Sequence, residues 1–380
     1  MPHMVPMPAT WALGGTLTVM PDGTSATEAE PTYPLRRGRR RRPARRPARI
    51  ARAGLLAIGW LIVGVLGLAA VLRLVSWDSI EPFAVIDALT LVIYLPAWIV
   101  AAGALIARRW WLAAAAAVIV AAQVVFVLPE LTAAAPVPAW ARDAPVVRIF
   151  DANIDDASRF YPVYVRAIEQ DRPDLITLEE FTPPAWRSMQ ASGVLAKYPD
   201  QCAAPQYGAI GFALVSRYPL TGCHEQTVLF DGWRVPYMVD ATMQTPSGPV
   251  TLRIVHTLAP FPSSFGEWKA ALAAVDRSVS AGSDGRMLMI GDFNASWDNK
   301  GFAALVHDGL TDGAAARGDA TEMTWPNGAV VPPFIRIDHV LTGSRLAVTG
   351  IVAKPGFGSD HRYVTATVAI QPQPGSKLGR

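Results

Sequence analysis

The run Met-Leu-Met-Ile-Gly-Asp-Phe-Asn-Ala-Ser, residues 287–296, is the most informative stretch of this 380-residue chain. Its first four residues are apolar, which predicts a strand covered on both faces, and Gly291 lets the backbone bend where that strand ends. Asp292 and Asn294 lie two residues apart, so their side chains point the same way. A carboxylate and a carboxamide held together suit a metal-bound phosphate, and the alternative is a polar loop capped by Asn294.

Similar strand-like runs recur through the second half of the chain. They occupy residues 146–150, 174–179, 209–216, 250–256, 286–290, 334–341 and 361–369. Polar side chains stand in or beside the ends of these runs, in the order Asn153, Asp155, Glu180, His256, Asp338, Asp360 and His361. Helical spacing or capping signals at 161–170, after Thr182 and at 264–279 predict helices between the strands.

This order of residues, Asn, Glu, His, Asp-x-Asn, Asp and Asp-His, resembles the endonuclease/exonuclease/phosphatase superfamily, which includes deoxyribonuclease I-like phosphoesterases. The resemblance extends over about residues 145 to 370. It implies an α/β (α+β) domain built as a four-layer α/β/β/α sandwich, with two sheets flanked by helices and the active site at one rim.

The family pattern assigns a metal site. It makes Glu180 the principal ligand of a divalent cation and places Asn153, Asp155 and Asp360 close to the metal or its waters. Hard oxygen ligands suit Mg²⁺, with Mn²⁺ as an alternative, rather than zinc.

The same pattern assigns the catalytic residues. Asp292 would orient and deprotonate the attacking water, and Asn294 would hold a phosphate oxygen. His256 and His361 would donate to the phosphoryl group, and Asp338 would orient His361 and stabilise its cationic form.

Four neighbouring polar residues are expected to lie outside the site. Side-chain alternation should turn Glu179 away if Glu180 points inward, and His339 should pack or face solvent on the opposite side of the strand from Asp338. Asp151 and Asp156 are expected to be solvated loop charges.

The first third of the chain indicates a membrane anchor. Three apolar stretches of about 19 to 25 residues can each cross a hydrocarbon core of roughly 30 Å, and they occupy residues 54–75, 83–107 and 110–128. Ten arginines lie between residues 36 and 52 and two more at 108–109, whereas the loop at 77–82 carries only acids. The positive-inside rule therefore predicts a cytoplasmic N-terminus and an extracytoplasmic domain after residue 130. Nucleic-acid binding is the alternative use of the arginines.

Individual residues in the membrane region have simple expectations. Arg73 can snorkel to the interface, Asp87 should lie at the interface near the start of its span, and Trp77, Trp110 and Trp111 should mark the membrane boundaries.

The domain organisation follows. We expect a disordered basic tail at 1–50, a membrane domain at 51–130, a linker at 131–145, the catalytic domain at 146–370 and a tail at 371–380. The chain has 34 Lys and Arg against 31 Asp and Glu, yet residues 144–370 carry 18 against 23. An acidic domain disfavours a nuclease, because nucleic-acid affinity rests largely on neutralising phosphates.

The sequence thus predicts a membrane-anchored, Mg²⁺- or Mn²⁺-dependent hydrolase of a phosphodiester or phosphomonoester, acting outside the cytoplasm. Its substrate could be a lipid head group, a small molecule or nucleic acid; membrane lipids surround it, and no protein partner is inferred. An extracellular nuclease and a catalytically silent phospho-ligand-binding scaffold or sensor are the alternatives. The only cysteines, Cys202 and Cys223, are candidates for a disulfide, or else two free thiols.

Overall fold

The computed structural model describes residues 45–280, 285–328, 330–356 and 358–374. The chain divides into two units, residues 1–51 and 52–380, and all that is described of the first is the beginning of helix α1 (Arg45–Ser76). The predicted tail at 1–50 and most of the one at 371–380 therefore lie outside the described residues.

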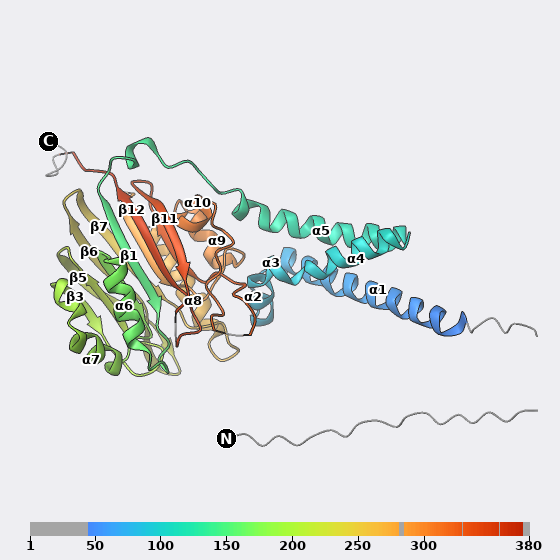
Figure 1. Ribbon diagram of the computed structural model, residues 1–380, viewed down its shortest axis with the longest axis horizontal. Coiled ribbons are helices and arrows are strands. Elements are labelled where there is room, and N and C mark those ends of the chain that lie inside the picture. The colour runs from blue at the N-terminus through green and yellow to red at the C-terminus, as the bar shows by residue number, and fades with distance from the viewer. Residues whose placement is uncertain (1–44, 281–284, 329, 357, 375–380) are drawn as a thin grey trace, which may run out of the picture. The chain divides into compact units, whose positions relative to one another are not determined.

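Two six-stranded sheets form the framework of the catalytic domain (Figure 1). The first has the order β11-β12-β1-β2-β4-β3. Its strands are β1 (Val146–Asn153), β2 (Leu175–Glu179), β3 (Asp200–Ala204), β4 (Phe212–Ser216), β11 (Leu346–Lys354) and β12 (Tyr363–Ile370). The second has the order β5-β6-β7-β8-β10-β9. Its strands are β5 (Leu220–Phe230), β6 (Trp233–Thr245), β7 (Gly248–His256), β8 (Met287–Asp292), β9 (Thr311–Asp312) and β10 (Asp338–Thr342).

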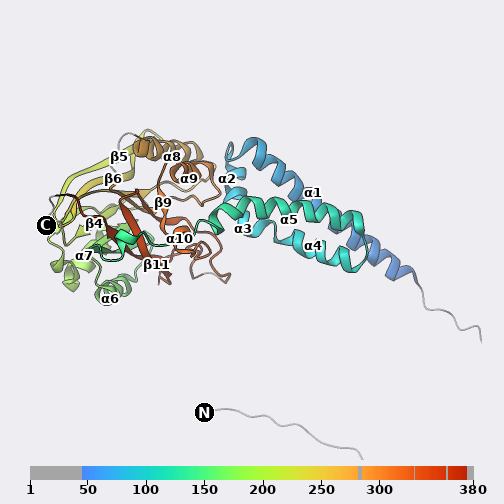
Figure 2. The same cartoon turned by 90° about the horizontal axis from the view of Figure 1, so that it is seen from above.

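The predicted four-layer sandwich is confirmed. One apolar core joins the inner faces of the two sheets, with Ile149 and Leu214 from the first sheet packed among residues such as Leu252 and Ile290 of the second. Two further cores lie on the outer faces, where helices cover the sheets. Figure 2 shows α8 (Phe265–Ser280) and α9 (Lys300–His307) on one side of the sheets and α6 (Tyr161–Asp171) and α7 (Pro183–Ser192) on the other.

Local sequence signals account for the helices that were expected. Thr182 caps α7, and its hydroxyl accepts a hydrogen bond from the amide of Ala185, while prolines occupy the first turn. The smaller helical elements are η1 (Ala139–Ala141), η2 (Val194–Lys197) and α10 (Gly313–Arg317). Strands β3, β5, β6, β9 and β11 were not predicted. Strand β5 and much of β3 and β11 are only partly buried and lack a clean apolar pattern, and β9 has only two residues.

The membrane region contains two straight candidate spans in the described part of the chain. Residues 49–76 of α1 and helix α5 (Trp110–Leu131) are long and apolar enough to cross a membrane. The stretch predicted as one span at 83–107 is instead α2 (Glu81–Ala88), α3 (Thr90–Ile93) and α4 (Leu95–Ile106), and the chain bends by 71° after α2. A third crossing requires this bent segment to act as one span.

Arg73 and Asp87 are buried partners, whereas their expected place at the membrane interface stays a prediction. The Arg73 guanidinium lies 3.5 Å from Asp87 Oδ1, donates to Thr90 Oγ1 at 2.7 Å and pairs with Asp298 of the catalytic domain at 2.9 Å. A buried cation keeps its charge where carboxylates compensate it, and Asp87 and Asp298 do so for Arg73.

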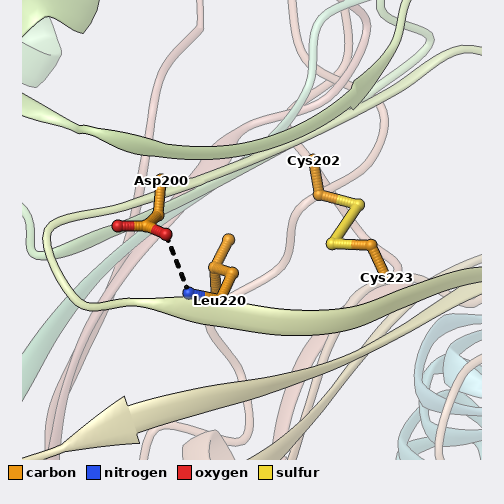
Figure 3. Close-up of a disulfide and its surroundings, with 4 residues drawn as sticks. All are labelled: Asp200, Cys202, Leu220 and Cys223. Atoms are coloured by element: carbon orange, nitrogen blue, oxygen red, sulfur yellow. Dashed lines mark hydrogen bonds between the residues drawn. A yellow bond between two sulfur atoms is a disulfide. The ribbon is translucent and has the colours of Figure 1, made fainter.

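A disulfide joins the edges of the two sheets. Cys202 on β3 is bonded to Cys223 on β5, with their Cα atoms 6.3 Å apart. Beside it the amide of Leu220 donates to Asp200 Oδ1 at 3.2 Å, so the same two strands share a hydrogen bond (Figure 3). Each of these strands ends its own sheet, and the bridge therefore links the sheets at their shared open edge.

Candidate active site

Strand pairing brings the polar residues to one rim. In the first sheet Asn153 lies opposite Glu179, because β1 and β2 are parallel and end at the same level. In the second sheet His256 lies opposite Asp292 in parallel strands, and Asp338 lies opposite Asp292 in the antiparallel pair. The rim of both sheets therefore carries the residues that the sequence had selected.

Asp292 is the centre of the constellation. Its Oδ1 accepts the amide N–H of Asn294 at 2.7 Å, and its Oδ2 accepts from the side-chain amides of Asn153 and Asn294 at 3.1 and 3.2 Å. The Nε2 atoms of His361 and His256 lie 3.7 and 3.8 Å from the same Oδ2. One carboxylate oxygen thus faces two imidazoles that come from different sheets.

His361 is held by Asp338. Its Nδ1 lies 3.0 and 3.1 Å from the two carboxylate oxygens, and both side chains are buried. Burial opposes a charged imidazole, yet the carboxylates of Asp338 and Asp292 outweigh it and raise the pKa of His361 to about 10. Burial raises the pKa of Asp292 to about 7, and burial lowers the pKa of His256. The two histidines therefore favour opposite protonation states.

A second group of acids lies beside this centre. Asp155, Asp156 and Glu180 can each offer an oxygen, and these atoms lie within 4.8 Å of one another. Glu180 is held by the side-chain amide of Asn153 at 3.0 Å and by the backbone N–H of Asp156 at 3.0 Å. Three half-buried carboxylates are a donor set that fits a hard divalent cation.

The remaining predicted residues have other contacts. The side-chain oxygen of Asn153 accepts the N–H of Asp155 at 3.0 Å, so this amide is already used within the protein. Asp360 is largely exposed, accepts the indole N–H of Trp325 at 2.9 Å and lies 3.8 Å from His361 Nε2. The side-chain amide of Asn294 also donates to the carbonyl of Thr257 at 2.8 Å, so a phosphate oxygen would have to replace one of its present partners.

Left-handed backbone conformations shape the rim. Asp155, Glu180 and Asn294 have φ angles of 58°, 54° and 47°, which are uncommon for residues with a side chain. Gly291 has a φ of 127°, and a Cβ atom there would lie 2.2 Å from the carbonyl oxygen of Val255. Only glycine fits where β8 passes so close to β7.

Two expectations about neighbouring acids are wrong. Asp151 is a buried residue of β1 and accepts a hydrogen bond from the Thr177 hydroxyl. Strand β1 continues to Asn153, so the side chains of Asp151 and Asn153, two residues apart, both point to the inner face of the sheet. Glu179 is also fully buried, beneath the site. The left-handed backbone at Glu180 turns the Glu180 carboxylate toward the site too, where it accepts a hydrogen bond from Asn153. Burial raises the pKa of Asp151 to about 8 and that of Glu179 well above its usual range.

Three other residues were not identified from the sequence. Asp156 was expected to be solvated but stands in the acidic group, and its place directly after Asp155 at a strand end was the available signal. Ser359 donates to the carbonyl of Asn153 at 2.8 Å and accepts the N–H of His361 at 2.9 Å, which ties two site segments together. The indole of Trp268 donates to the carbonyl of Asn294 at 3.1 Å, a contact that no local pattern predicts.

A two-sheet sandwich that gathers acids, amides and imidazoles at one rim defines a class of phosphoester hydrolases. Within that class, the chain belongs to the endonuclease/exonuclease/phosphatase family, whose model matches residues 164–361. Enzymes of this family depend on divalent metal ions. No curated protein sequence matches the chain.

Solved structures share the fold at low identity. The truncated TDP2 of Caenorhabditis elegans is 16% identical, with 59% of this chain and 97% of that one covered and a TM-score of 0.50. An endonuclease/exonuclease/phosphatase protein from Beutenbergia cavernae is 17% identical over 59% and 72% of the chains, with a TM-score of 0.48. The Neisseria 3′ phosphatase NExo, bound to a product DNA hairpin, is 18% identical over 58% and 98%, with a TM-score of 0.48.

Proposed function

We propose that this protein is a membrane-anchored hydrolase of a phosphodiester, with a divalent cation such as Mg²⁺ or Mn²⁺ as its cofactor and its catalytic domain outside the cytoplasm. The observation that carries the proposal is the environment of Asp292, whose one oxygen faces His256, His361 and Asn153 beside an acidic group. A phosphomonoester is the second candidate, because the same groups serve both reactions.

The chemistry follows from the positions of the side chains. Asp292, with a pKa of about 7, accepts a proton from water near neutral pH while the water oxygen bonds to phosphorus. The bond from phosphorus to the leaving oxygen breaks, that oxygen takes a proton from solvent, and Asp292 returns its own proton to solvent. The cationic His361 stabilises the negative charge that grows on the phosphoryl oxygens, and His256 donates a hydrogen bond to them.

The metal would be held by the acidic group. Glu180, Asp155 and Asp156 offer the hard oxygen ligands, and Asn153 orients Glu180. Burial raises the pKa of the Asp155 carboxyl, and the nearby charge of Asp360 raises it further. Asp360 can therefore add to the negative charge that would attract the metal. A bound divalent cation supplies Lewis-acid stabilisation of a phosphoester anion.

A panel assay tests the activity. We expect the detergent-solubilised full chain to hydrolyse bis(p-nitrophenyl) phosphate or another diester with Mg²⁺ or Mn²⁺, and to stop when EDTA removes the metal. Asp292→Asn should lower kcat by about two to four orders of magnitude, whereas the exposed Asp308→Asn should retain the wild-type rate. Plasmid DNA, RNA and inositol phosphates complete the panel, and the absence of metal-dependent hydrolysis of every substrate would contradict the proposal in favour of a silent binding domain.

Topology has its own test. The arginine asymmetry supports an extracytoplasmic catalytic domain. We therefore expect protease added to intact cells or spheroplasts to digest the domain after residue 145 and to leave the N-terminal tail protected. Digestion only after lysis would place the domain in the cytoplasm.

A further inference from the structure

The exposed apolar side chains of the catalytic domain are concentrated at one place. Among its described residues nine large apolar side chains are exposed, and seven of them lie on loops or hairpins at the rim that carries Asp292. The other two are Val146, at the start of β1, and Val352, on the edge strand β11. Monomeric soluble proteins rarely gather such side chains, and a concentration of them marks a binding surface.

Three of the seven lie on loops that leave the sheets at the rim. Phe160 follows the end of β1, and Phe261 lies just beyond His256 at the end of β7. Tyr207 lies in the turn between β3 and β4, and the first residue of β4, Phe212, is paired with Glu179 at the rim.

The other four extend further from the sheets. Strands β5 and β6 continue as a hairpin beyond the level of His256, and Leu229 and Trp233 stand near its tip. Val330 and Val331 lie on the loop that leads into β10 at Asp338. Trp233 is 77% exposed, so its indole has no substantial apolar cover in the described structure.

The membrane helices end beside the same rim. At the end of α1, Arg73 pairs with Asp298 and the indole of Trp77 donates to the Asp298 carbonyl at 2.8 Å, four residues after Asn294. Glu130, near the end of α5, pairs with Arg336, two residues before Asp338. Both helices are thus joined to segments that lead directly into the site.

We propose that the rim loops enter the interfacial zone of the bilayer and that the substrate is a phosphodiester lipid of that bilayer, whose head group reaches Asp292; this rests on the proposed function. Aromatic side chains favour the membrane–water boundary, and exposed aliphatic ones gain from burial in it. Nucleic acid fits less well, since Leu229, Val330 and Val331 have no ring to stack on bases and residues 144–370 carry five more acids than bases.

Nanodiscs containing the full chain provide the test. Phosphatidylglycerol or sphingomyelin in the same nanodisc is the lipid substrate, and bis(p-nitrophenyl) phosphate is the soluble one. The variants are Trp233→Ala with Phe261→Ala, and Val352→Ala as the exposed apolar control away from the rim. We expect the rim double variant to lose about tenfold or more in kcat/KM toward the lipid, and to hydrolyse the soluble diester within about twofold of wild type.

A binding measurement adds a readout independent of turnover. Brominated lipids should quench the tryptophan fluorescence of the wild type more than that of Trp233→Phe, because only the wild type has the Trp233 indole at the membrane interface.

The outcomes are distinct. If the protein hydrolyses the soluble diester but neither lipid, the lipid inference is overturned and the proposed function stays intact. The same holds if the rim variant loses only the cleavage of single-stranded nucleic acid. Equal losses on both substrates, or none on the lipid, would show that the rim side chains do not engage the bilayer. Failure to hydrolyse any diester with either metal would refute the proposed function itself.

Discussion

Replacing Asp338 by asparagine should separate the orientation of His361 from its charge. The carboxylate contacts Nδ1 through both oxygens, and the pKa of His361 rises from 6.5 to about 10 although burial opposes the shift. A rise of that size corresponds to about 5 kcal/mol of stabilisation of the imidazolium. An amide keeps a hydrogen-bonding partner at the same place but removes the negative charge of Asp338. Burial then opposes the imidazolium while only Asp292 and Asp360 still favour it, so the pKa of His361 should fall well below 10.

The expected rate effect follows from this change. The wild type should not lose the His361 cation until the pH approaches 10, whereas Asp338→Asn should lose it at a clearly lower pH. At pH 8 we expect kcat to fall by about 10²- to 10³-fold with metal saturating.

The free energy of unfolding should depend on pH in the same direction as the His361 charge. In the wild type the contribution of this pair to stability is fully present below pH 6.5 and is lost as the pH rises through about 10, whereas the variant should lose it at a lower pH. Melting temperatures of the metal-free proteins at pH 6 and pH 8 measure the difference.

The assay is the pH–rate profile together with an NMR titration of the metal-free protein, in which the His361 resonance is assigned by its loss in His361→Ala. The chain has only six histidines, which makes the assignment practical. An unchanged His361 pKa in Asp338→Asn would refute the electrostatic argument. The double variant should be little worse than His361→Ala alone, and losses that simply multiply would show that the two residues act independently.

Three further predictions concern stability. Glu130→Ala removes one of the two carboxylates beside the buried Arg336, whose guanidinium still lies 3.7 Å from Asp312, and should cost about 1 to 3 kcal/mol, so an unchanged melting temperature in detergent would contradict the pairing. Burial raises the pKa of Asp151 to about 8, so between about pH 4 and 8 this carboxyl ionises in the unfolded chain but stays protonated in the fold, and stability falls as the pH rises. Asp151→Asn should therefore raise the melting temperature at pH 8 and change it little at pH 4, and the reverse order would refute the shift. Reduction of Cys202–Cys223, which are 21 residues apart, should lower stability by about 3 kcal/mol, and the double alanine variant should be insensitive to reductant.

The amino-acid sequence by itself determined the architecture and most of the polar residues of the rim. Apolar runs that end in Asn153, Glu180, His256 and Asp292 predicted strands whose ends would meet, and the pairing of β1 with β2 and of β7 with β8 brings them together. The positions of these strands and helices were readable because a strand's period of two and a helix's period of 3.6 are local properties, whereas the four-layer architecture and the residues' roles were implied by the resemblance to the family. The apolar length of α1 and α5 was readable for the same reason.

Only the tertiary structure decided the immediate environment of each charge. Asp151 and Glu179 lie in an apolar run and beside a site residue respectively, and no local pattern shows that the opposing sheet would bury both. Arg73 finds Asp298 across 225 residues, and the indole of Trp268 finds the carbonyl of Asn294 across 26. The protonation state of a buried group depends on solvent exclusion and on every charge within a few ångströms, which are set by chain segments distant in sequence, so it emerges only once the sheets have packed.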